Sequence, residues 1–101
     1  MSKDNAQTAA PVDGNVVQRY EGVDNYGRPK SDYLKNIAEM NDEELGRECY
    51  QMIYHSARCN NAPRADWHWM VGACYDESKR RDDSGEIYSE AFDECYADHA
   101  G

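Results

Sequence analysis

The chain contains no long hydrophobic run, which leaves no candidate for a membrane-spanning helix. Such a helix needs ~20 consecutive apolar residues, and no segment of these 101 residues approaches that length. The N-terminal stretch MSKDNAQTAAPVDG also lacks the apolar core of a secretory signal peptide. We therefore expect a cytoplasmic protein with no membrane contact.

Motifs of common catalytic and metal sites are also absent. The chain has no glycine-rich phosphate loop, no G-x-S-x-G and no H-E-x-x-H. Structural zinc sites use close ligand pairs such as C-x₂₋₄-C, whereas the nearest cysteines, Cys49 and Cys59, lie ten residues apart. His55 and His99 have no evident orienting partner. These absences predict a protein with no catalytic residues, no metal and no cofactor.

The four cysteines are expected to be free thiols. Cytosolic cysteines stay reduced, and free cysteine is among the residue types that are buried most often. Cys49, Cys74 and Cys95 occupy core-like positions in the helical pattern described below. In a secreted protein the four cysteines would instead allow three disulfide pairings, and the sequence does not choose among them.

Basic residues are few, and the balance of charge restricts the partners. Twenty Asp and Glu against eleven Lys and Arg give a net charge of −9. Nucleic acid is therefore a poor direct ligand, because its phosphates would be repelled. A basic protein surface is the expected partner, and added solubility is the alternative role for the acidity. The oligomeric state does not follow from the sequence.

The sequence predicts little regular structure in the N-terminal third of the chain. Residues 1–14 have no large apolar side chain after Met1 to offset the entropy of ordering, so we predict a disordered tail. Residues 15–30 contain two glycines and a proline that interrupt any long element. We expect an extended arm there, with Tyr20 and Tyr26 packed against the helices.

Helical periodicity accounts for the remainder, and residues 15–101 are expected to form a single helical domain. The predicted helices cover residues 31–40, 41–58, 63–81 and 83–99. Their short connectors favour antiparallel neighbours. The predicted fold class is all-α, a small bundle of three to four helices.

Several residues mark where these helices begin. Asn41 with Glu44 three positions later forms a variant of the capping box. Ser31 and Asp83 are the expected N-caps of the first and last helices, and Pro63 is expected in a first turn. The acids of the first turn after Asn41 are fully explained by the helix dipole, so we assign them no functional role.

Apolar side chains recur at helical spacing on three expected core faces. The face of the 41–58 helix contains Leu45, Cys49, Met52, Ile53 and Ser56. The face of the 63–81 helix contains Trp67, Met70, Val71, Cys74, Tyr75 and Ser78. The face of the last helix contains Tyr88, Ala91, Phe92, Cys95 and His99.

Trp69 and Tyr96 are the two possible aromatic anchors for a partner. Trp67 and Trp69 lie two positions apart, so they cannot face the same way on one helix. If Trp67 lies in the core, Trp69 is half exposed and suits an interface, as does Tyr96. The alternative is that both tryptophans bridge packed helices.

The last twenty residues, DDSGEIYSEAFDECYADHAG, have the most one-sided chemistry of the chain, with seven carboxylates and no Lys or Arg. On a helix, five of the acids spread over an arc of roughly 140° and cover ~18 Å of axis. That is one charge per ~4 Å, similar to the ~3.4 Å along one DNA strand. The candidate binding residues are Glu86, Glu90, Asp93, Glu94 and Asp98, preceded by Asp82 and Asp83.

The arrangement of these acids destabilises their own helix. Glu86/Glu90, Glu90/Glu94 and Glu94/Asp98 are like-charge pairs at i,i+4. Glu94 and Asp98 also approach the helix C-terminus, where the dipole disfavours anions. The basic trio Lys79–Arg81 is expected to complement the preceding helix's dipole beside Asp82 and Asp83. Either arginines elsewhere in the fold compensate the acids, or a function requires them.

In size, acidity and lack of catalytic motifs the chain resembles small acidic phage-encoded anti-defence proteins, including anti-CRISPR proteins that mimic DNA. The resemblance implies an inhibitor in the host-cell cytoplasm whose target is a CRISPR surveillance complex or another DNA-binding machine. A rival hypothesis is a small structural or assembly protein that docks through its aromatic residues and keeps its acids for solubility.

Overall fold

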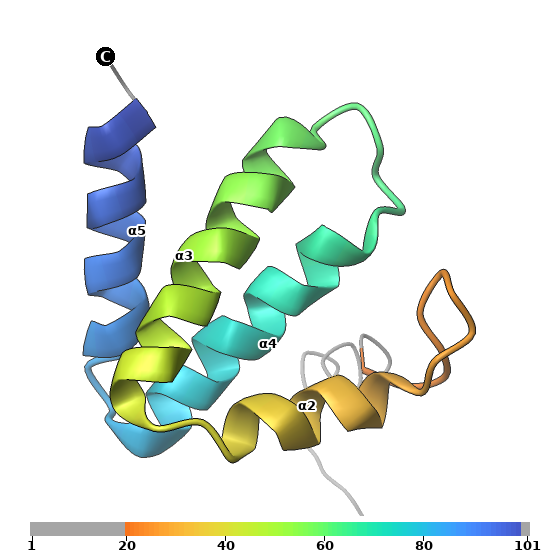
Figure 1. Ribbon diagram of the computed structural model, residues 1–101, viewed down its shortest axis with the longest axis horizontal. Helices are drawn as coiled ribbons and strands as arrows, with labels where there is room; N and C mark the ends of the chain where they lie inside the picture. The colour runs from red at the N-terminus through yellow and green to blue at the C-terminus, as the bar shows by residue number, and fades with distance from the viewer. Residues whose placement is uncertain (1–19, 100–101) are drawn as a thin grey trace, which may run out of the picture.

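The computed structural model describes residues 20–99, which fold into a bundle of four helices (Figure 1). The helices are α2 (Lys30–Ala38), α3 (Asp42–Arg58), α4 (Asp66–Arg81) and α5 (Glu86–His99). Helix α3 lies between α4 and α5 and packs against both, and these three run antiparallel in sequence, while α2 crosses beside α4. The predicted all-α class is confirmed; the predicted disordered tail, residues 1–14, lies outside the described residues.

The arm before α2 packs onto the start of α4. An isolated antiparallel bridge joins Val23 to Pro29 and closes a loop. The Asn25 side chain donates to the Arg64 carbonyl at 2.9 Å, and its backbone N–H lies 3.1 Å from an Asp66 oxygen. The expected packing of Tyr20 is confirmed, since it packs against the core cluster.

Tyr26 does not pack against the helices as expected. It is 81% exposed at the tip of the loop that the bridge closes. Its neighbour Gly27 has a φ of +83°, which turns the chain back at this point. The turn therefore directs the Tyr26 side chain toward solvent.

The start of α3 follows the sequence prediction. The Asn41 side chain accepts a hydrogen bond from the Glu44 N–H at 2.8 Å, and Glu44 accepts one from the Asn41 N–H at 2.9 Å. Both halves of the capping box are present. Local chemistry is sufficient here because donor and acceptor lie three residues apart.

The other three predicted helix starts are wrong. Helix α2 begins at Lys30 instead of capping at Ser31, because Pro29 holds the extended N-cap position with its φ fixed at −60°. Helix α4 begins at Asp66, since residues 62–65 close a turn that contains Pro63. The chain from Asp82 to Gly85 is also a turn, closed by a 2.8 Å bond from the Gly85 N–H to the Asp82 carbonyl.

Gly85 determines where α5 begins. Its φ of +65° lies in the left-handed region, which L side chains rarely adopt, so the helix starts immediately afterwards at Glu86. Asp83 is therefore not the N-cap of the last helix. Helix α2 ends at Ala38, before the predicted residue 40, because residues 39–41 form the connection to α3.

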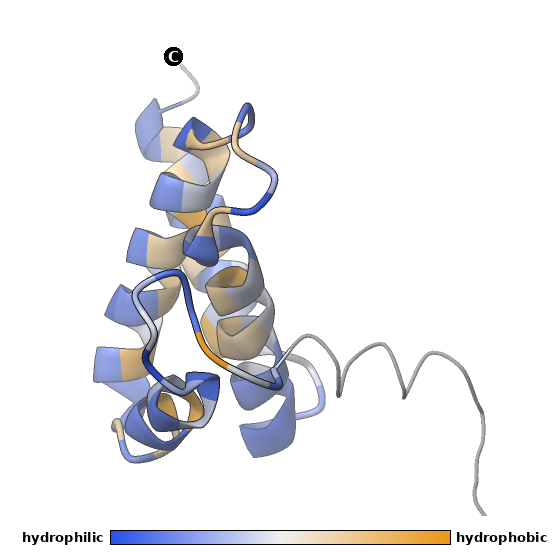
Figure 2. Cartoon of the chain, turned by 90° about the vertical axis from the view of Figure 1, so that its right-hand side faces the viewer, coloured by the Kyte–Doolittle hydropathy of each residue, from blue (hydrophilic) through white to orange (hydrophobic). Residues whose placement is uncertain are grey.

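The core lies where α3 meets α4 and α5, and hydrophilic positions cover the outside of the bundle (Figure 2). Most of its buried side chains are small or sulfur-containing. The buried hydrophobic residues are Ile37, Leu45, Cys49, Met52, Ala73, Cys74, Ala91 and Cys95. The expected burial of Phe92, Tyr75 and His99 is wrong, since the first two are 46% and 44% exposed and the third is also exposed. Helix α5 presents Ala91 and Cys95 inward, which rotates Phe92 out.

Arg81 links the ends of α2 and α4. Its Nη2 donates to the carbonyls of Met40 at 2.7 Å and Ile37 at 3.0 Å. Its Nε donates to the buried Glu77 at 2.8 Å, and Arg80 contacts the same carboxylate. The predicted placement of the basic trio is confirmed, since Lys79, Arg80 and Arg81 lie in the last turn of α4, where Glu77 and the α2 terminus bind the two arginines.

The cysteine prediction is confirmed. All four cysteines are free thiols, and Cys49, Cys74 and Cys95 are buried while Cys59 is half-buried. None of the helices between residues 20 and 99 is both long and apolar enough to cross a bilayer.

Candidate functional site

The predicted acidic residues of the C-terminal segment are all exposed. The salt bridges formed among residues 20–99 use acids elsewhere, namely Asp24, Asp42, Glu43 and Glu77. Within this described part, no lysine or arginine forms a salt bridge with Glu86, Glu90, Asp93 or Glu94. Their charge is left to solvent or to a partner.

Asp98 differs from the other acids because it has a local partner. The Tyr50 hydroxyl on α3 donates to its Oδ2 at 2.6 Å and lies 3.2 Å from His99 Nε2. The bond to Asp98 raises the pKa of Tyr50 to about 12, because losing the proton would break it. Asp98 therefore has a partner within the fold and attaches the end of α5 to α3.

Glu86 and Glu90 crowd each other as their i,i+4 spacing predicts. A hydrogen bond with Glu86 and repulsion from its charge raise the pKa of Glu90, and Glu94 adds to the repulsion. Like charges at i,i+4 destabilise a helix, so this crowding is unfavourable for α5. A cation placed between the two carboxylates would relieve it.

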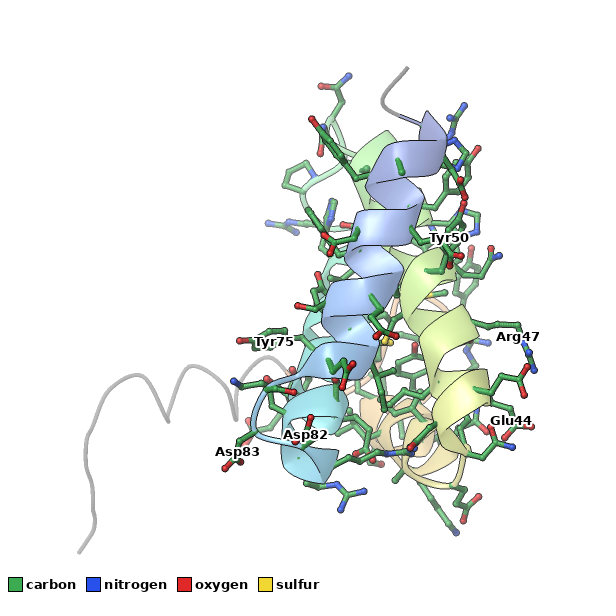
Figure 3. The ribbon with its side chains drawn as sticks, turned by 90° about the vertical axis from the view of Figure 1, so that its left-hand side faces the viewer. Glu44, Arg47, Tyr50, Tyr75, Asp82 and Asp83 are labelled. Atoms are coloured by element: carbon green, nitrogen blue, oxygen red, sulfur yellow. The ribbon has the colours of Figure 1, made fainter. Side chains whose placement is uncertain are left out.

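Asp82 and Asp83 lie apart from the α3 side of the acidic face. Figure 3 shows them at the α4–α5 connection, on the other side of α5 from Tyr50 and Arg47 of α3. The Lys79 side chain donates to the Asp83 backbone carbonyl at 2.5 Å, which leaves the carboxylate of that residue exposed. The predicted seven-residue acidic set thus divides into a helical face and a separate pair at the connection.

A groove of about 540 Å³ runs between α3 and α5, and the sequence analysis did not predict it. Two of the predicted acids, Glu90 and Glu94, form part of one wall. The other lining residues are Asp42, Glu43, Gly46, Arg47, Tyr50, Gln51, Ile87 and Ala91. The sequence contains one indication of this groove, which is the glycine at position 46 in the otherwise regular pattern of α3. A residue without a side chain leaves space between packed helices.

The two predicted aromatic anchors have different environments. Trp69 is half-buried, and its indole N–H donates to Asp66 at 3.0 Å while its ring meets Tyr33 edge-on at 5.5 Å. Trp67 stacks on His55 at 4.5 Å, so both tryptophans bridge structural elements, as the alternative interpretation held. Tyr96 is 68% exposed and remains available to a partner.

Tyr96 belongs to a wider aromatic edge that the sequence analysis did not predict. Tyr75 and Phe92 are also exposed, and Tyr88 between them lies 5.2 Å from the Tyr75 ring and 6.4 Å from that of Phe92. The i,i+4 repeat of Tyr88, Phe92 and Tyr96 was a signal for it, but the same repeat is typical of a core face. The edge flanks the acidic face on α5.

One hydroxyl–imidazole contact was also missed. Ser56 Oγ lies 2.7 Å from His68 Nδ1, and His68 Nε2 lies 3.1 Å from the carbonyls of both Cys59 and Ala62. These contacts hold the α3–α4 connection against α4. Among residues 20–99, no three His, Cys, Asp or Glu side chains are grouped so that they would hold a metal ion.

The fold and this surface define a small helical protein whose outer helix is acidic on one side and aromatic on the other. No protein family model, curated protein or solved structure matches the chain. The functional argument therefore depends on the chemistry of the surface.

Proposed function

We propose that the chain is a non-enzymatic inhibitor that occupies a basic, nucleic-acid-binding surface of a protein partner with the acidic face of α5. The supporting observation is the exposure of Glu86, Glu90, Asp93 and Glu94 without a cation bound to them in the described part of the chain. A surface that binds DNA carries lysines and arginines for phosphates. Carboxylates at comparable spacing compete for the same cations.

The spacing on α5 is suited to this competition. Glu86, Glu90 and Glu94 repeat every four residues, which is ~6 Å of helix axis, and Asp93 lies within the step from Glu90 to Glu94. Phosphates on one DNA strand recur every ~3.4 Å along the axis. Because the chain resembles small anti-defence proteins, the partner that we propose is a CRISPR surveillance complex or another DNA-binding machine in the host cytoplasm.

Charge reversal tests the proposal. The partner is first captured from host lysate with the wild-type chain, and its affinity is then measured with Glu90, Asp93 and Glu94 changed to Lys. Binding should be abolished while the helical circular dichroism is retained, and duplex DNA should displace the wild-type chain. The matched control changes Glu21, Asp32 and Glu39 to Lys, an equal charge change at exposed positions away from α5. Unchanged affinity in the folded α5 variant would refute the proposal.

A second candidate function is docking in an assembly through the aromatic edge. The observation that favours it is the exposure of Tyr75, Phe92 and Tyr96, at 44%, 46% and 68%. Here apolar burial supplies the affinity, so partner binding should change little with ionic strength and should be lost on Phe92→Ser with Tyr96→Ser. Mimicry predicts the opposite, a steep loss of affinity as salt rises.

A further inference from the structure

The floor of the α3–α5 groove is apolar and open because of one residue. Gly46 of α3 faces Ile87 of α5, and a Cβ placed on Gly46 would lie 3.8 Å from Ile87 Cγ2, an ordinary contact. The fold therefore has room for a Cβ at position 46, and the glycine leaves the floor of the groove open there. Ala91 extends this floor along α5 with another small side chain.

The walls of the groove are acidic. Four carboxylates, from Asp42, Glu43, Glu90 and Glu94, stand against one guanidinium, that of Arg47. Arg47 lies 3.2 Å from Glu43, and Asp42 lies 2.9 Å from Arg81, so these two acids already have cations. The unmet charge is concentrated on the α5 wall, at Glu90 and Glu94.

We propose that this groove binds a basic amphipathic helix of a protein partner. One aliphatic side chain of that helix is held over Gly46, Ile87 and Ala91, and its flanking lysines or arginines contact Glu90 and Glu94. A groove between two packed helices accepts the side-chain ridge of a third, and the acidic wall selects a basic one. The inference rests on the proposed function and adds the groove to the contacts that the outer acids, Glu86 and Asp93, make with the partner.

Filling the hollow tests the proposal without changing any charge. Gly46→Leu adds an aliphatic side chain to the groove floor, and Leu is a strong helix former. Ser89→Leu is the matched control, since residue 89 is exposed on α5 and does not line the groove. Helical circular dichroism should be retained in both variants.

The probes are two fluorescein-labelled peptides of 14 residues made of leucine and lysine only. One has leucines at helical i, i+3, i+4 spacing, and the other has the same composition in scrambled order. Fluorescence anisotropy should show the amphipathic peptide binding the wild type about tenfold tighter than the scrambled one, and about tenfold weaker binding to Gly46→Leu. The Ser89→Leu protein should bind like wild type.

Three outcomes overturn the groove proposal: no peptide binding, equal binding of both peptides, or unchanged affinity in Gly46→Leu. A sedimentation experiment showing self-association that Gly46→Leu abolishes would overturn it too, because the occupant would then be a second copy of the chain. If the Leu variant does not fold, Gly46→Ala serves instead, with an expected loss of about fourfold. Insensitivity to Gly46→Leu combined with loss of partner capture on charge reversal refutes the groove alone and leaves the proposed function standing.

Discussion

Arg81 is the residue whose loss should affect the stability of the fold most clearly. Its guanidinium donates to the carbonyls at the end of α2, to the buried Glu77 and to Asp42. Only 16% of its side chain is exposed. The change Arg81→Met keeps a long apolar stem in place and removes every one of these hydrogen bonds.

The size of the stability loss in Arg81→Met depends on which of the Arg81 contacts are shielded from water. A hydrogen bond to a charged group contributes about 1.5–3 kcal/mol, and breaking a buried pair costs about 3–5 kcal/mol. Asp42 is 77% exposed, so its ion pair contributes little, and Glu77 keeps Arg80 as a second cation. We therefore expect Arg81→Met to lower the free energy of unfolding by about 2–4 kcal/mol.

Urea denaturation followed by circular dichroism measures this loss of free energy of unfolding, and thermal denaturation measures the corresponding change in Tm. A domain of this size loses about 4–8 °C of Tm for each kcal/mol, so Tm should fall by about 10–25 °C. Arg81→Lys is the control: it keeps the charge near Glu77 but cannot reach several acceptors with one planar fork, so it should recover only part of the stability. A change below about 0.5 kcal/mol in the Met variant, which is the level of an ordinary surface substitution, would refute this account of the α2–α4 junction.

Two further predictions concern titration and reactivity. A hydrogen bond from Arg80, opposed by burial and reinforced by Arg81, lowers the pKa of Glu77 below 4.5, so its contribution to stability is present above pH 4.5 and is lost as pH falls through the lowered value. Urea unfolding of the wild type and Glu77→Gln should differ most near neutral pH and converge in acid; a constant difference would contradict this. With iodoacetamide on the native protein, intact mass should show one fast adduct at half-buried Cys59 and three slow ones, whereas denatured protein should take up four at once; four equal native rates would contradict the burial pattern.

The parts of the fold that sequence predicts are those fixed by contacts within one helical turn. Asn41 and Glu44 satisfy each other across three residues, so the start of α3 was predicted correctly. The start of α5 was not, because a cap at Asp83 is locally reasonable and only the left-handed backbone of Gly85 prevents it. The helical class itself depends on periodicity along whole segments, which is why it was confirmed despite the shifted boundaries.

The candidate surface likewise combines a feature that the sequence predicts with features that depend on how the helices pack. That the α5 acids are exposed follows from their charge, and the sequence alone indicates it. The groove and the aromatic edge depend on how far α5 is rotated against α3. Ala91 and Cys95 allow close approach and turn Phe92 outward, although Phe92 carries the stronger hydrophobic signal. Rotation of a helix by one residue position, ~100°, is below what an amphipathic pattern resolves when small and aromatic residues alternate on neighbouring positions.

The distribution of arginines decides how the acidity of α5 is interpreted. The sequence left two options, that arginines elsewhere in the fold compensate these acids or that the charge serves a function. In the described part of the chain, Arg28, Arg47, Arg80 and Arg81 form their salt bridges with acids outside α5. Tyr50 stabilises Asp98 with a neutral hydroxyl and leaves its charge in place. Among residues 20–99, arginines thus do not compensate the acids of α5. Solubility alone does not require carboxylates spaced closely enough to raise the pKa of Glu90, because the same net charge placed further apart would cost the helix less. The binding role proposed for α5 would account for this crowding.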